Sequence, residues 1–192
     1  WNPFPSTYDQ ALVDAADRLP ELDGDREIST KRKDLRHLPF VTIDPHDAKD
    51  FDDAICLIEE NGVRTLWVAI ADVAHYVQPD SRLDGAARAR ATSVYLPHTV
   101  LPMLPPRLAD DLCSLRAGVS RLAMVVAMNI NTENEIDDCT AYEAVIQVAE
   151  NMAYEDALDN PQFDEMFKLA SHWQEKEIRL NIQNAELRPR LH

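Results

Sequence analysis

Short apolar runs separated by polar segments recur along most of the chain. Five of them have the length and the Val, Ile and Leu content of β-strands, and they occupy residues 40–43, 54–58, 65–73, 121–131 and 139–148. The dipeptide Asn61-Gly62 lies between two of these runs and is typical of a tight hairpin turn. The run 65–73 is continuously apolar, so we expect it inside the sheet with both faces covered. The pattern predicts a sheet of about five strands.

Other segments repeat their apolar residues every three or four positions, which is the period of a helix. They occupy residues 8–19, 83–91 and 107–115, and from Asn151 onward the chain is expected to be helical, first at 154–158 and then from Pro161 to about residue 182. Asp23-Gly24-Asp25 predicts a turn. We therefore expect an α+β (mixed α/β) fold, with helices flanking a mixed, mostly antiparallel sheet. Residues 1–39 are interpreted as a lead-in segment and 40–192 as the domain proper.

Five aspartates fall within ten residues where the first two strands meet, and they are Asp44, Asp47, Asp50, Asp52 and Asp53. Asp44 closes the first strand and Asp52 and Asp53 open the second. Carboxylates this close repel one another unless positive charge lies among them, and the stretch offers only Lys49. Oxygen ligands of this kind suit Mg²⁺ or Mn²⁺. We interpret the stretch as a metal site for phosphate chemistry, against the alternative of a solvated acidic turn.

Other phosphate and metal motifs fit the chain poorly. A calcium loop starting at Asp50 would need Gly and Glu where the sequence has Ile55 and Asn61. The four glycines are isolated, which excludes a glycine-rich phosphate loop or a dinucleotide fingerprint, so no nucleotide cofactor is expected. A phosphatase of the haloacid type places an Asp-x-Asp-x-Thr/Val motif directly after a strand, and the stretch here does not.

The charge balance limits the kinds of partner that the chain can bind. With 19 Lys and Arg against 34 Asp and Glu, the formal net charge is −15, which argues against a general nucleic-acid binder. The one basic cluster, Lys31-Arg32-Lys33 with Arg36, is either a contact for RNA phosphates or a solvated run of charge.

Cysteine use and hydropathy bear on the compartment. Three widely spaced cysteines fit a reducing cytoplasm, and the apolar surroundings of Cys56 and Cys113 predict buried thiols rather than a zinc site. No apolar run is long enough to span a bilayer, so no membrane partner is expected. The start at Trp1 is interpreted as a processed or excised end, and the chain beyond Asn184 as a cut one.

The run TIDPHDAKDFDDAI, residues 42–55, resembles the signature of the RNase II and RNase R exoribonucleases. The likeness continues in RKDLRHLPF (32–40), VAIADVAHYV (68–77), YLP (95–97) and LPMLPPRLADDLCSL (101–115). The resemblance implies the N-terminal half of an RNB-type catalytic domain, and a monomer that degrades single-stranded RNA from 3′ to 5′ into nucleoside 5′-monophosphates. Asp110-Asp111 and Arg116-Ala117 replace the Asn-Gly and Asn-Pro of the RNase R pattern, which brings this part nearer to RNase II.

The same resemblance assigns roles to individual residues. Asp44, Asp50, Asp52 and Asp53 would be the metal carboxylates of a two-metal site, with Asp50 and Asp52 the catalytic pair. Asp47 has no counterpart and is expected to be solvated. Tyr95 would stack on nucleotides near the RNA 3′ end, the alternative being a partly buried structural tyrosine. Asp72 is expected to cap a turn rather than support the metals, and Trp67 to lie in the core.

One part of the family pattern is missing. Its catalytic arginine lies in a later Thr-Ser-Pro-Ile-Arg motif, which these 192 residues do not contain. We therefore expect the chain alone to be inactive or nearly so. The alternative hypothesis is a non-catalytic module that binds RNA or protein.

Overall fold

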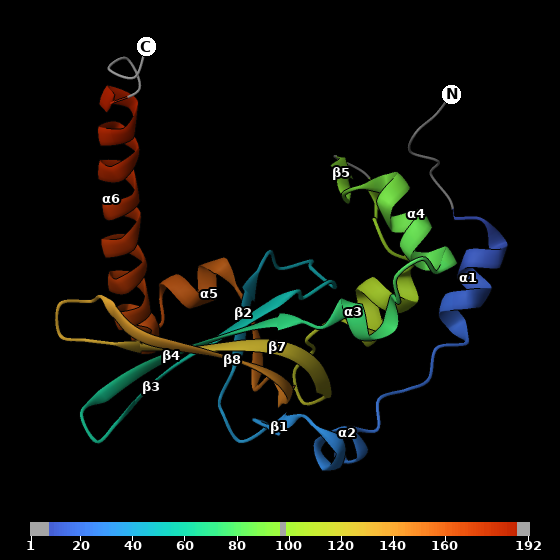
Figure 1. The fold of residues 1–192 in the computed structure, drawn as a ribbon, viewed down its shortest axis with the longest axis horizontal. Coiled ribbons are helices and arrows are strands. Elements are labelled where there is room, and N and C mark those ends of the chain that lie inside the picture. Colours follow the sequence, from blue (N-terminus) through green and yellow to red (C-terminus); the bar gives the residue numbers. More distant parts are fainter. Residues whose placement is uncertain (1–7, 97–98, 188–192) are drawn as a thin grey trace.

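A seven-stranded mixed sheet forms the centre of the molecule (Figure 1). The computed structural model describes residues 8–96 and 99–187, with side chains to residue 177. The strands are β1 (Lys33–Asp34), β2 (Val41–Asp44), β3 (Asp53–Glu60), β4 (Val63–Ala71), β7 (Ser120–Ile130), β8 (Ile136–Gln147) and β9 (Glu150–Ala153). Their spatial order is β1-β8-β7-β4-β3-β2-β9, and only the two outer pairs, β1 with β8 and β2 with β9, are parallel. The predicted α+β fold with a mostly antiparallel sheet is confirmed.

The central hairpin follows directly from the sequence. Asn61 and Gly62 join β3 to β4 with φ angles of 53° and 80°, the left-handed conformation that an Asn-Gly hairpin turn requires. As expected, β4 lies inside the sheet, between β3 and β7. The expectation that both of its faces are covered is wrong near its end, because Ile70 is 49% exposed where that face opens into a pocket.

Two edge strands and a helix were not predicted. The chain was expected to be helical from Asn151 onward, but residues 150–153 form β9, which pairs in parallel with β2 from Val41–Glu150 to Asp44–Ala153. The predicted turn at Asp23-Gly24-Asp25 is also wrong, because Asp23 caps helix α2 (Gly24–Thr30) by accepting a hydrogen bond from the Arg26 backbone. Val145 Cγ1 would lie 3.4 Å from a Cβ atom at position 24, so the glycine allows the helix to approach the sheet closely.

The remaining helices gather at the two ends of the sheet. Helices α1 (Gln10–Asp17), α3 (Val73–Tyr76), α4 (Arg82–Arg90) and the π-helical turn Arg107–Leu112 lie at one end, as Figure 1 shows. At the other end are α5 (Tyr154–Leu158), the 3₁₀ turn Pro161–Phe163 and α6 (Asp164–Leu187), which projects away from the sheet (Figure 1). The predicted helices 8–19, 83–91 and 154–158 are confirmed within two residues, whereas 107–115 forms only the shorter π-helical turn.

A two-stranded ribbon was not foreseen. Strands β5 (Val94–Leu96) and β6 (Thr99–Leu101) pair antiparallel as a separate sheet. The ribbon includes Tyr95, the residue expected to stack on RNA. Pro97 of the YLP motif and the end of the chain beyond residue 187 lie outside the described residues.

The main core lies between the sheet and the helices α1, α3 and α4 together with the π-helical turn. Its fully buried members include Phe40, Leu108, Leu112, Leu115 and Ile146. Trp67 packs against this core and stacks on Tyr142 with ring centroids 6.3 Å apart, which confirms its structural role. Cys56 and Cys113 are buried as predicted, and burial raises the pKa of their thiols to about 11 and about 12. Within the described residues, no helix is long and apolar enough to cross a membrane.

Candidate functional site

All five aspartates of the signature stretch line one cavity of about 870 Å³. Asp44 is the last residue of β2 and Asp53 is the first of β3. These two strands pair only at Val41 and Ile55, so the chain between Asp44 and Asp53 separates from the sheet and forms the acidic loop (residues 44–53) that borders the cavity. The structure thus brings together the residues that the sequence grouped, and Lys49 also lines the cavity.

Backbone hydrogen bonds from two distant segments hold the acidic loop in place. The Ser114 hydroxyl donates to the Lys49 carbonyl at 2.6 Å and accepts from the Phe51 amide at 3.3 Å. The Leu115 amide donates to the Phe51 carbonyl at 2.9 Å, and the Ala71 amide donates to the Asp52 carbonyl at 2.8 Å. Ser114 is fully buried, so this attachment is part of the core and fixes where the aspartates emerge.

Partial burial, and then repulsion from neighbouring carboxylates, raises the pKa of two of these aspartates. Partial burial raises the pKa of Asp44 despite a hydrogen bond from Thr42, and the charges of Asp53 and Asp50 raise it further. Loss of water contact also raises the pKa of Asp52, followed by repulsion from Asp50, Asp53 and Asp44. The four carboxylates expected to bind metal are therefore electrostatically coupled, and each would be stabilised by a cation in the cavity.

The donor set fits a hard divalent cation, although the ligands are not assembled around one point. The Oδ2 atom of Asp44 is buried and has no hydrogen-bond partner within the described residues. A buried carboxylate oxygen without a partner is unfavourable unless something binds it. Within the same residues, however, no three acidic, histidine or cysteine side chains lie close enough together to hold an ion as they stand. Aspartate side chains would have to change rotamer for three or more of them to share an ion.

Tyr95 extends from the ribbon toward the acidic loop. The structural alternative supposed a partly buried tyrosine, but Tyr95 is 66% exposed. Its hydroxyl donates to Asp50 Oδ2 at 2.7 Å, and this bond, together with partial desolvation and the charge of Asp50, raises the pKa of Tyr95 to about 12. The ring is thus available at the cavity while the hydroxyl engages one of the expected metal ligands.

Two further residues of the cavity wall escaped the sequence analysis. Asp110 lies on the π-helical turn, and partial burial and the charge of Asp50 raise its pKa. Tyr8 comes from the lead-in segment, and its hydroxyl donates to the Pro102 carbonyl while Arg90 lies 4.0 Å from its ring centroid. The Asp110-Asp111 pair was a visible sequence signal for the first, but nothing in the local sequence links Tyr8 to its partner Pro102, 94 residues away.

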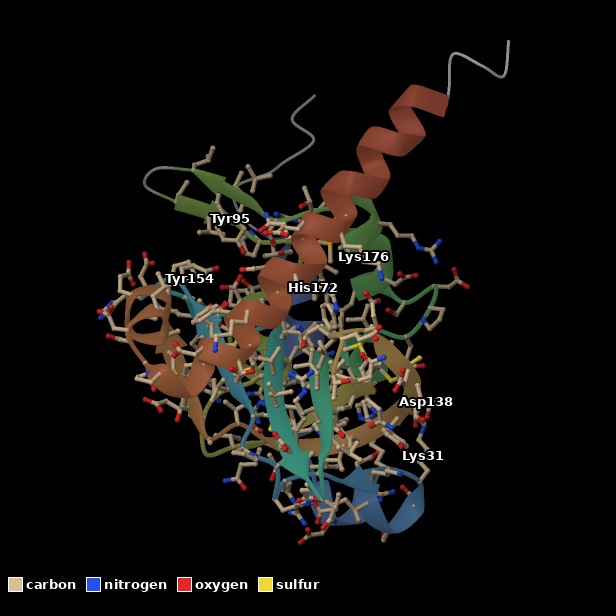
Figure 2. All side chains as sticks on the ribbon, turned by 90° about the vertical axis from the view of Figure 1, so that its left-hand side faces the viewer. Lys31, Tyr95, Asp138, Tyr154, His172 and Lys176 are labelled. Atoms are coloured by element: carbon tan, nitrogen blue, oxygen red, sulfur yellow. The ribbon has the colours of Figure 1, made fainter. Side chains whose placement is uncertain are left out.

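The basic cluster does not belong to this site. Arg32 is buried and pairs with Asp72 at 2.6 Å, while Lys31 pairs with Glu143 at 2.8 Å. Lys33 lies 3.6 Å from the Tyr142 ring centroid, and Arg36 pairs with Asp34 and Asp25. Figure 2 shows Lys31 at the opposite end of the molecule from Tyr95. Arg32 is thus buried in an internal ion pair, which neither alternative anticipated, whereas Lys31 and Lys33 are exposed, as the alternative of a solvated run supposed.

Asp72 has the structural role that was preferred for it. Its side chain accepts a hydrogen bond from the His75 amide at 3.2 Å and so caps α3, and it also holds the buried Arg32. The turn-cap prediction is confirmed.

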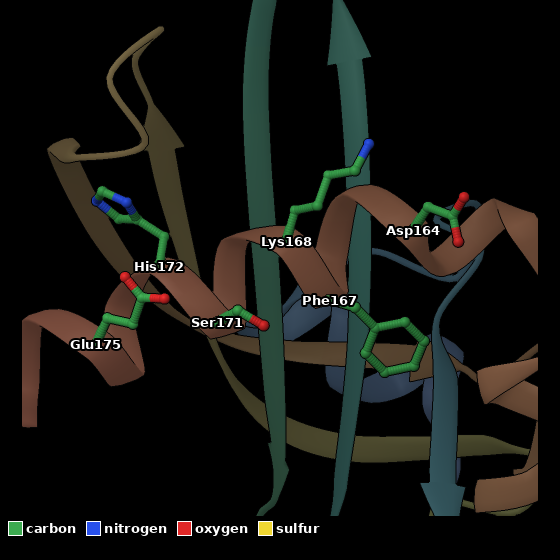
Figure 3. Close-up of a pocket in the computed structure, with 6 residues that line it drawn as sticks. All are labelled: Asp164, Phe167, Lys168, Ser171, His172 and Glu175. Atoms are coloured by element: carbon green, nitrogen blue, oxygen red, sulfur yellow. The ribbon is translucent and has the colours of Figure 1, made fainter.

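A second hollow of about 630 Å³ runs along α6 and is lined by Asp164, Phe167, Lys168, Ser171, His172 and Glu175. Ser171 and His172 follow one another on the helix, and Figure 3 shows their side chains pointing in different directions. The His172 ring contacts Glu135 of the β7–β8 loop at 3.5 Å. Because these residues come from one face of a single helix and do not converge, the acidic cavity remains the candidate site.

Comparison with known proteins agrees with the signature. The RNB domain matches residues 32–180. Ribonuclease R of Buchnera aphidicola subsp. Schizaphis graminum is 52% identical over 118 residues, covering 60% of this chain and 16% of the relative. The solved structure of Mycoplasma genitalium RNase R in complex with ribose methylated single-stranded RNA superimposes with a TM-score of 0.74 at 35% identity, covering 78% of this chain and 23% of that one.

A more distant structure shares the fold alone. Yeast Ssd1, described as a pseudonuclease, superimposes with a TM-score of 0.63 at 20% identity, covering 72% of this chain and 17% of that one. The chain therefore spans between 16 and 23% of the length of these three proteins.

Proposed function

The chain belongs to the RNB-domain family, as the resemblance predicted, and from that membership we propose that it supplies the metal-binding part of the catalytic site of an exoribonuclease. The reaction is hydrolysis of single-stranded RNA from its 3′ end, releasing nucleoside 5′-monophosphates. Because the chain spans less than a quarter of the relatives, the complete activity needs residues beyond it.

One observation carries the proposal. Asp44, Asp50, Asp52 and Asp53 line the same cavity, and the buried Asp44 Oδ2 has no partner among the described residues. These four carboxylates would hold Mg²⁺ or Mn²⁺, which when bound supply the positive charge that activates water and stabilises the departing oxygen. Without such charge, the cavity would repel the phosphate that it is proposed to cleave.

The side chains around the carboxylates have supporting roles in this proposal. Tyr95 presents an exposed ring at the cavity, where stacking on a base contributes about 1–3 kcal/mol without sequence preference. Pro102 and Pro106 line the same cavity and have no backbone N–H to donate. The Ser114 hydroxyl hydrogen-bonds to the backbone of the acidic loop, so the aspartate side chains remain available for the cation.

A second candidate is a non-catalytic RNA- or protein-binding module. It is favoured by the absence, among the described residues, of three assembled metal ligands, and by a fold shared with a pseudonuclease. The two candidates differ in one measurable property, since only the catalytic proposal requires divalent cations to bind the four aspartates.

Isothermal titration of Mn²⁺ and Mg²⁺ into the 192-residue chain tests the proposal. We expect binding that weakens about tenfold or more in Asp52→Asn, which removes one ligand charge with almost no change in size. Asp47→Asn is the matched control, because Asp47 lines the same cavity and carries the same charge but has no counterpart among the family's metal carboxylates, so its loss should change affinity by no more than about twofold. Equal losses in both variants would indicate diffuse attraction to an acidic surface, and no binding to the wild type would favour the non-catalytic module.

A further inference from the structure

The ribbon β5–β6 is attached to the body of the molecule at its base and again above the acidic loop. At the base, the Met103 amide donates to the Ser93 hydroxyl at 3.0 Å, and the Pro102 carbonyl accepts from both Tyr8 and Arg90. Above the acidic loop, Tyr95 donates to Asp50 Oδ2 at 2.7 Å. Among the described residues, this is the one hydrogen bond that joins residues 94–101 to the acidic loop.

The tyrosine and a cation compete for the same oxygen. The Tyr95 hydroxyl uses one of the two lone pairs of Asp50 Oδ2, and its proton places partial positive charge beside an oxygen that a cation would coordinate, so the two positive groups repel each other there. The inference rests on the proposed function, in which Asp50 is a metal ligand. Under that proposal, the Tyr95–Asp50 bond holds one of the four expected metal ligands in place through the ribbon.

We propose that Tyr95 is a latch on the metal site: its hydroxyl holds Asp50 in the ion-free protein, and a divalent cation displaces it. Release frees the Tyr95 ring, which is 66% exposed, from its attachment to the acidic loop. Leu96 and Val100 of the same ribbon are 48% and 46% exposed, so few packing contacts oppose its release. Metal binding thereby changes the position of the tyrosine: in the ion-free protein its hydroxyl holds the exposed ring beside Asp50, and in the loaded protein the ring is free to turn toward an RNA base.

The latch makes a prediction opposite to that for an ordinary site residue. Tyr95→Phe keeps the ring and removes the competing hydroxyl, so the 192-residue chain should bind Mn²⁺ about 3 to 10 times more tightly than wild type, the usual worth of one hydrogen bond. A residue that merely supports the site would weaken binding when altered. Tyr142→Phe is the matched control, because its ring stacks on Trp67 and does not line the acidic cavity, and it should leave the affinity unchanged.

A second measurement observes the displacement directly. With 3-fluorotyrosine in place of the five tyrosines, the fluorine resonance missing from Tyr95→Phe identifies residue 95, and it should move when Mg²⁺ saturates the wild-type chain. Tighter Mn²⁺ binding by Tyr95→Phe and a shifted Tyr95 resonance support the latch. If wild type and Tyr95→Phe bind Mn²⁺ equally, or if the resonance stays in place while Mg²⁺ binds, the latch is wrong and the metal site stands. If neither chain binds a divalent ion, the proposed function fails together with the latch.

Discussion

At the scale of single residues, the acidic cavity contains aspartate carboxylates whose negative charges the fold does not neutralise. The raised pKa of Asp52 means that the folded state binds its proton more tightly than the unfolded state does. Its protonated form therefore favours folding at low pH, and this contribution is lost as pH rises from the usual value of 3.8 through the raised pKa. At neutral pH and without metal, ionised Asp52 opposes folding.

Asp52→Asn should consequently raise the melting temperature of the metal-free chain at about pH 7. The gain should shrink as the pH falls toward 3.8, because wild-type Asp52 then becomes neutral as well. Differential scanning calorimetry in EDTA between about pH 4 and about pH 8 measures both effects, with Asp47→Asn as the charge-matched control. A stabilisation that grows on acidification would contradict the assigned direction of the pKa shift.

The sequence could predict which aspartates meet, but not what contacts them. Asp44, Asp50, Asp52 and Asp53 lie within ten residues, so one loop between two strands is sufficient to bring them to the same cavity. Tyr8 and the Tyr95–Asp50 bond depend on how segments far apart in the chain pack together, and no local pattern encodes that distance. Arg32 was misjudged for the same reason, since its partner Asp72 is 40 residues away.

At the scale of elements, the Arg32–Asp72 pair ties the lead-in to the end of β4. The exposures of the two side chains are 2% and 8%, so removal of one partner leaves a charge buried without compensation. We expect Arg32→Met to lower the free energy of unfolding by about 3–5 kcal/mol. Lys31→Met is the control, because its pair with Glu143 is exposed and contributes about 0–1 kcal/mol. Urea unfolding distinguishes the two, and similar losses would mean that the lead-in is not held by this pair.

The hairpin turn gives a second test at this scale. Gly62 has a φ of +80°, which an alanine side chain tolerates poorly, so Gly62→Ala should cost about 1–2 kcal/mol. Gly85 lies in helix α4, where a methyl group on its Cα would have no neighbouring atom within 4 Å, so Gly85→Ala should stabilise by about 0.5–1 kcal/mol. Chemical denaturation should therefore give a lower midpoint for Gly62→Ala and a higher midpoint for Gly85→Ala than for the wild type. If both midpoints rise, the reduced entropy of the unfolded chain outweighs the strain at the turn.

Long central strands were predictable, and short edge strands were not. The strands β3, β4, β7 and β8 have eight or more residues each, enough for their apolar content to be visible in the sequence. By contrast, β1 has two residues and β9 has four, and each is defined by parallel pairing with a distant strand. Glu150, Met152 and Ala153 are helix formers, so pairing with β2 overrides the local preference of this segment.

At the scale of the whole molecule, charge sets the expected behaviour toward RNA. The net charge of −15 follows from the sequence, and the structure adds what the basic side chains contact. Arg32, Lys31, Lys33 and Arg36, which form the one basic cluster of the sequence, are held in contacts within the chain, and Lys31 lies far from Tyr95 (Figure 2). Unless a cation neutralises it, an acidic cavity repels a polyanion.

We therefore expect the 192-residue chain to bind single-stranded RNA weakly and to degrade it little or not at all. In EDTA, a dissociation constant weaker than the ~10⁻⁴–10⁻⁶ M typical of nonspecific binding by basic proteins is expected, because few cations are available to release counterions. Mg²⁺ should tighten binding by neutralising the aspartates, and Asp52→Asn should tighten it in EDTA, since one repelling charge is gone.

Loss of a single preorganised cationic donor lowers rates by about 10²–10³, and the arginine of the later family motif is absent from this sequence. Fluorescence anisotropy with a 5′-labelled RNA, read beside a denaturing gel of the same samples, measures both properties. Micromolar binding in EDTA with a steep salt dependence would reveal a basic RNA surface elsewhere on the chain, and a full ladder of shortened products would show that these 192 residues suffice for hydrolysis.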